Sequence, residues 1–130
     1  FMNKILVEIS VGELLDKISI LEIKKEKISD TSSLENINVE YSILKEQLEK
    51  NIQNDKKTNE LFQSLKEVNA KLWVIEDDKR TCEKNADFGE KFIKLSRDIH
   101  FLNDKRARIK LEINTHSGSK IKEIKQYTKY

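Results

Sequence analysis

The chain contains no proline and only three glycines among its 130 residues. Sheet-rich folds use these two residue types in their turns, so their scarcity argues against such a fold and in favour of helices. The single cysteine, Cys82, excludes an internal disulfide and fits a reducing compartment.

Long hydrophobic runs and a strong net charge are also missing. No stretch of about twenty apolar residues is present to cross a bilayer, and the start of the chain does not have the shape of a signal peptide. The net charge of +2 is the small remainder of 25 basic and 23 acidic side chains, too little for a general attraction to nucleic acid. We therefore expect a cytoplasmic protein that binds neither membrane nor nucleic acid.

The residues that are present repeat with helical periodicity. Charged and hydrophobic residues each make up 37% of the chain, and apolar positions recur at spacings of three and four. This pattern predicts an all-α antiparallel four-helix bundle of long helical hairpins, as one domain over 2–118 with a basic tail over 119–130. The predicted helices cover about 11–29, 33–53, 59–85 and 88–115.

Capping signals mark the ends of these helices. Ser10 with Glu13 and Ser32 with Glu35 have the spacing of capping boxes, and Thr58 or Asn59 can cap the third helix. Asp87 and Glu90 form another capping pair, before the fourth helix. Gly118 can end the fourth helix in the left-handed conformation.

One segment favours a strand. Residues 4–9 read Lys-Ile-Leu-Val-Glu-Ile, a β-branched run. No second strand is evident, so its backbone groups need the C-terminal tail, a second copy of the chain, or water. We favour the second copy, which predicts a homodimer.

The predicted fourth helix carries a basic residue in its apolar line. Arg106 occupies the periodic position between Leu102 and Ile109 and stays charged at any ordinary pH. An arginine in such a seam needs an acidic partner, a bound anion or a water-filled pocket.

Polar residues at similar positions on the other helices suggest what surrounds Arg106. The candidate set consists of Asp16, Glu22, Trp73, Glu76, Arg80, Asn103, Arg106 and Lys110. In a ligand site, the arginines and the lysine would clamp a phosphate or carboxylate, Trp73 would form a wall, and Glu76 would act as the catalytic acid or base. In a structural network, Asp16 or Glu22 would neutralise Arg106 and fix the helix register. We favour the structural interpretation, because lone polar residues in helical seams commonly specify pairing.

Metal and cofactor chemistry is not expected. His100 and His116 lie far apart, with no cysteine or carboxylate at ligand spacing. Glycine loops that cradle phosphates and nucleophile elbows are absent from the sequence.

Several segments resemble an uncharacterised bacterial family of small helical proteins. They are Gly12-Glu13-Leu14-Leu15-Asp16-Lys17-Ile18 with Leu21-Glu22-Ile23-Lys24, Leu72-Trp73 with Ile75-Glu76-Asp77, Asp87-Phe88-Gly89 with Phe92-Ile93, and Asn103-Asp104 with Arg106-Ala107 and Ile113-Asn114. That family is a domain of unknown function, associated with neighbourhoods of glycosyltransferase and surface-polysaccharide genes. The resemblance thus implies an accessory role in bacterial glycan synthesis, with no assigned catalytic residues.

Two functions follow from these observations. The first is a non-enzymatic binding or assembly module that forms a homodimer. Its further partner would be another protein, or a small anionic ligand bound at the charged cluster. The alternative is a small all-α enzyme that acts on an anionic metabolite held by Arg80, Arg106 and Lys110.

Overall fold

The computed structural model describes residues 3–120, 123–126 and 128–129, and within these ranges the secondary structure is entirely helical. The helices are α1 (Val11–Lys27), α2 (Thr31–Asn51), α3 (Lys56–Lys84) and α4 (Glu90–Ser117). The prediction of an all-helical chain with four helices is confirmed for the described residues. Among these helices, none combines the length and the apolar character needed to cross a bilayer.

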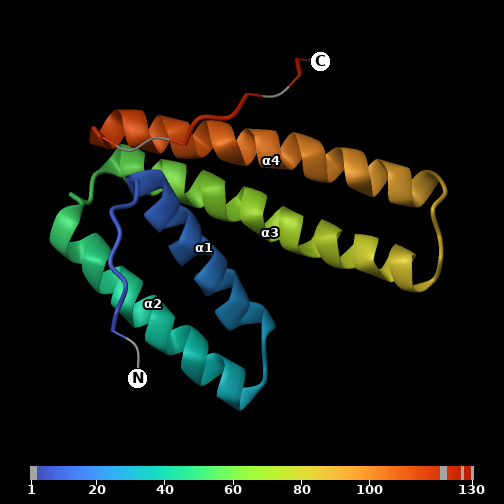
Figure 1. Cartoon of the computed structure of the whole chain (residues 1–130), viewed down its shortest axis with the longest axis horizontal. Helices are drawn as coiled ribbons and strands as arrows, with labels where there is room; N and C mark the ends of the chain where they lie inside the picture. The colour runs from blue at the N-terminus through green and yellow to red at the C-terminus, as the bar shows by residue number, and fades with distance from the viewer. Residues whose placement is uncertain (1–2, 121–122, 127, 130) are drawn as a thin grey trace.

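The four helices form two hairpins that meet at one end and diverge (Figure 1). Close backbone contacts join α1 to α2 and α3 to α4, and α1 also lies against both α3 and α4. No close backbone contact joins α2 to α3 or α4 within the described chain. Helix α1 is therefore the element that connects the two hairpins, as its nearly all-round apolar pattern suggests.

The main core lies where α1 crosses the α3–α4 hairpin. Its buried side chains are Leu15, Leu61, Leu65, Val68, Leu72, Ile109 and Ile113. Ile18 and Leu21 of α1 and Ile37 of α2 are also buried, and α1 packs against α2 in the other hairpin. Removing this apolar surface from water is the main source of stability for a fold of this kind.

Two of the predicted helix ends are confirmed. The hydroxyl of Ser10 accepts a hydrogen bond from the backbone N–H of Glu13 at 3.1 Å, which satisfies one of the open donors of the first turn of α1. Gly118 ends α4 with a φ of 70°, the left-handed conformation that glycine adopts at low cost.

The other predicted caps are wrong in detail. Helix α2 is capped by Asp30, which accepts from the backbone N–H of Ser33, and α3 is capped by Asp55, which accepts from that of Thr58. A carboxylate two to four residues upstream thus replaces the predicted hydroxyl or amide, because it accepts hydrogen bonds from open donors of the first turn and adds negative charge at the positive end of the helix. No side chain caps α4 at Gly89, and Asp87 instead accepts from the backbone N–H of Gly89.

The strand predicted over 4–9 is wrong: these residues are neither helix nor strand in the structure. Ile5 and Leu6 are 88% and 87% exposed. The local β propensity is real, but a strand needs a neighbouring strand to pair its backbone groups, and the described residues of this chain provide none.

The α3–α4 hairpin projects well beyond α1 (Figure 1). In α4 the first buried side chain is that of Ile109, although the helix begins nineteen positions earlier at Glu90. In α3 only Cys82 is buried beyond Leu72. The outer part of this hairpin is consequently a pair of helices with a seam that is half open to solvent.

Candidate functional site

A charged cluster lies where α1 meets the α3–α4 hairpin, and a glycine allows the two to approach closely. The backbone N–H of Gly12 donates to Asn114 Oδ1 at 2.7 Å. A Cβ at position 12 would lie 2.6 Å from the backbone oxygen of Lys110, closer than real carbon–oxygen contacts. The absence of a side chain at Gly12 therefore sets the distance between α1 and α4.

Asp16 is the centre of this cluster, with an exposed fraction of 1%. Arg106 Nε donates to Asp16 Oδ1 at 3.0 Å, and Arg106 Nη2 donates to the other carboxylate oxygen. Asn69 Nδ2 also donates to Asp16 Oδ1, at 2.8 Å. The carboxylate is thus held by a two-pronged guanidinium contact from α4 and an amide from α3, the geometry in which charged hydrogen bonds are strongest.

Ser19 completes the network around Asp16. Its hydroxyl donates to the backbone oxygen of Asp16 at 2.8 Å and accepts from Asn69 Nδ2 at the same distance. Among the described residues, no buried side-chain nitrogen or oxygen lacks a hydrogen-bond partner. A fully satisfied network of this kind is compatible with stability, whereas a partly satisfied one is costly.

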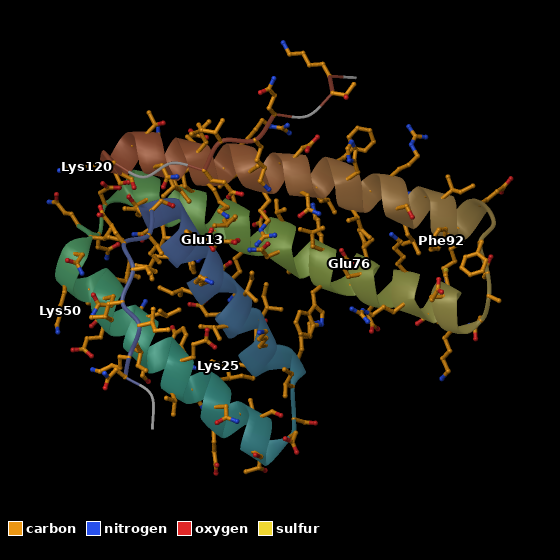
Figure 2. All side chains as sticks on the ribbon, viewed as in Figure 1. Glu13, Lys25, Lys50, Glu76, Phe92 and Lys120 are labelled. Atoms are coloured by element: carbon orange, nitrogen blue, oxygen red, sulfur yellow. The ribbon has the colours of Figure 1, made fainter. Side chains whose placement is uncertain are left out.

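Lys110 extends the cluster toward the N-terminal end of α1. Its Nζ donates to Glu13 Oε2 at 2.7 Å and to Glu123 Oε2 at 3.3 Å, and lies 3.6 Å from Asp16 Oδ2. Glu13, on the first turn of α1 (Figure 2), therefore has two roles. Its backbone N–H donates to the capping hydroxyl of Ser10, and its carboxylate accepts from Lys110.

The electrostatics match this geometry. Burial alone would raise the pKa of Asp16, but hydrogen bonds from Arg106 and Asn69, together with the charges of Arg106 and Lys110, outweigh it and lower the pKa below 3.8. Burial likewise opposes the charge of Lys110, yet the hydrogen bond to Glu13 and the charge of Asp16 raise its pKa. Both partners are accordingly charged at neutral pH.

The structure brings three of the predicted site residues into this cluster, namely Asp16, Arg106 and Lys110. It places Glu22, the other acid expected to neutralise Arg106, elsewhere. Glu22 accepts from Tyr41 Oη at 3.3 Å and from Lys66 Nζ at 3.1 Å. Of the two acids expected opposite Arg106, Asp16 is the one in contact.

The remaining predicted residues line a hollow beside the cluster, with a volume of about 360 Å³. Its lining consists of Ile20, Asn69, Leu72, Trp73, Glu76, Asp77, Arg80, Asn103 and Arg106. The hollow lies at the point where the two hairpins diverge, and Glu76 is on the stretch of α3 beyond α1 (Figure 2). The two carboxylates in the lining oppose an anion, and Lys110 is not part of it.

Sequence reasoning did not include Asn69, Ser19 and Asn114 in the site. Asn69 shares a helical face with Trp73 and Glu76, and that spacing was the available signal. Ser19 and Asn114 gave no comparable signal, because small polar residues are common in charged helices and their burial depends on how α1 crosses the hairpin.

The lowered pKa of Asp16 predicts a specific acid sensitivity. The contribution of its ionised form to the free energy of unfolding is complete above the ordinary value of 3.8 and is lost as the pH falls through the lower value in the folded state. We expect Asp16→Asn to be much less stable than the wild type at pH 7 and closer to it near pH 2.5. Urea unfolding at the two pH values measures this difference.

Glu67→Gln, a change at an exposed position of α3, is the control and should differ little in stability from the wild type at either pH. If the difference in free energy of unfolding between Asp16→Asn and the wild type does not narrow in acid, the assignment is wrong.

Comparison with known proteins adds a family and no function. No curated protein and no solved structure is significantly similar to the chain. One family model, described as a family of unknown function (DUF6165), matches residues 5–130. The bacterial origin and the glycan-gene association implied by the resemblance stay predictions. Because the match covers nearly the whole chain, including both hairpins and the charged cluster, the protein belongs to the DUF6165 family.

Proposed function

We propose that the chain is a non-enzymatic binding and assembly module, whose binding surface is the part of the α3–α4 hairpin that projects beyond α1. The observation that carries this proposal is the absence of any buried side chain in α4 before Ile109. The family resemblance adds an accessory role in bacterial surface-glycan synthesis to the proposal.

The projecting hairpin exposes apolar side chains that a second layer of helices would cover. Phe88 and Ile93 are 54% and 56% exposed, and Val74 and Phe101 are also exposed. Phe92 lies near the tip between the two helices, where Phe88 packs edge-on against it (Figure 2). Large apolar side chains that are exposed together on one part of a molecule favour a site where proteins associate.

The charged cluster supports the same function. Arg106 and Lys110 are both held by carboxylates of this chain, so an anionic ligand would have to displace Asp16 or Glu13 before it could bind them. Displacing Asp16 would leave a buried carboxylate without its counter-charge, which costs several kcal/mol. The cluster thus acts as the attachment of α1 to the hairpin.

A small enzyme acting on an anionic metabolite is the second candidate, because the hollow beside Trp73 contains Glu76, Arg80 and Arg106. This alternative predicts that some phosphorylated or carboxylated metabolite raises the melting temperature of the wild type and has less effect on Arg80→Gln. Arg80 is exposed, so this substitution tests the ligand site without disturbing the fold. The assembly module predicts that no member of a metabolite panel separates the two proteins.

Photo-crosslinking tests the binding surface directly. A photoreactive amino acid placed at position 76, on the projecting part of α3, should yield covalent adducts with a polypeptide in the cells that naturally produce the protein. The same amino acid at Lys71, exposed on the opposite side of α3, serves as the matched control and should yield none. If mass spectrometry finds no polypeptide adduct specific to position 76, this surface is not an assembly surface.

A further inference from the structure

One side of the projecting part of α3 is complementary to itself. Trp73, Glu76, Asp77, Arg80 and Lys84 recur at spacings of three and four, so they share one side of the helix. We call this side the open face of α3. Its first four members line the hollow where the two hairpins diverge.

We propose that the open face of α3 binds the open face of a second copy of the chain, in antiparallel orientation about a two-fold axis. This inference rests on the proposed function and names its partner. The two projecting hairpins then form a four-helix bundle, with the α1–α2 hairpins at opposite ends.

The order of charges along the open face favours this partner and this orientation. The acids Glu76 and Asp77 come first and the bases Arg80 and Lys84 follow, with a third acid, Glu83, at the edge of the face beside Lys84. A parallel pairing would set like charges against each other. An antiparallel pairing centred between Asp78 and Lys79 sets Asp77 against Arg80 of the partner subunit, and the two-fold axis repeats this contact.

The same register gives Trp73 a partner. It places Lys84 of the partner subunit over the indole ring, a cation–π contact of the kind that Lys79 and Phe92 make within the chain at 5.3 Å. Trp73 is half-buried in the single chain and becomes covered in the pair. Each open face therefore contributes an aromatic anchor and a reciprocal ion pair.

The size of the contact sets its strength. From Trp73 to Lys84 the helix rises about 17 Å, and two helices side by side are roughly 20 Å wide. The footprint is then on the order of 350 Å² per partner, or about 700 Å² in total, before the relief of the side chains is counted, which is smaller than a standard specific interface. We therefore expect a weak, transient dimer that forms at high protein concentration and dissociates on dilution.

Charge reversal in the purified full chain tests the register. By sedimentation velocity, the wild type should change from monomer to dimer with rising concentration, and the emission of Trp73, the single tryptophan, should shift to shorter wavelength. Asp77→Arg or Arg80→Asp alone should weaken the dimer at least tenfold, because like charges then meet across the axis. A mixture of the D77R and R80D chains should form heterodimers, since every acid again faces a base. Lys71→Asp, on the opposite side of α3, should leave dimerisation unchanged, and so should deletion of residues 3–7.

Three results would overturn the inference. One is a wild type that stays monomeric at every concentration. Another is a dimer that neither charge reversal weakens, or that deletion of residues 3–7 abolishes. The third is a mixture of the D77R and R80D chains that forms no heterodimer although each chain alone is folded and monomeric. If the purified chain is monomeric while position 76 crosslinks to a different protein, this inference fails and the proposed function stands.

Discussion

The attachment of α1 to the α3–α4 hairpin depends on one buried ion pair, between Asp16 and Arg106. The carboxylate is 1% exposed and receives hydrogen bonds from two other helices. Replacing such a pair by apolar residues of similar volume is often neutral or stabilising, so the pair is poorly explained as a source of stability alone. Its geometry requires one register of α1 on the hairpin, because the fork of Arg106 fits the carboxylate in a single orientation.

That register has consequences far from the ion pair. Gly12 must lie against the backbone of α4 for Asp16 to reach Arg106, and α1 then leaves the hairpin near Trp73. Beyond this point α3 and α4 pack only against each other, so the seam between them is half open to solvent. Glu76, Asp77 and Arg80 of the open face line the hollow that results. The same contact that closes one end of the molecule thus exposes the surface to which we assign assembly.

Much of the fold could be predicted from the sequence because helical periodicity is a local property. Short-range spacing predicts the apolar seams that contain Leu61, Leu65 and Ile113. It also predicts the helix ends at Ser10 and Gly118. Arg106 was recognisable as an anomaly in an apolar line, which required a partner. The sequence could not show whether Asp16 or Glu22 pairs with Arg106, because that depends on the angle at which α1 crosses the hairpin.

The strand over 4–9 shows the opposite case. Its β-branched residues favour extended backbone, but whether a strand forms is decided by a partner elsewhere. The divergence of the two hairpins was equally hidden, because periodicity shows which side of a helix is apolar and not how much of it another helix covers. Both errors arise because the outcome depends on contacts between distant parts of the chain, which local sequence preference does not show.

A double-mutant cycle between positions 16 and 106 tests the central claim most directly. The free energy of unfolding in urea would be measured for the wild type, Asp16→Leu, Arg106→Met and the double variant. We predict that Arg106→Met costs about 3 kcal/mol, because it leaves the buried carboxylate of Asp16 without its partner. Asp16→Leu should cost less, because the guanidinium of Arg106 is partly exposed to water. The double change should cost far less than the sum of the two. Single changes that cost under about 1 kcal/mol and add independently would show that this ion pair does not hold α1 in place.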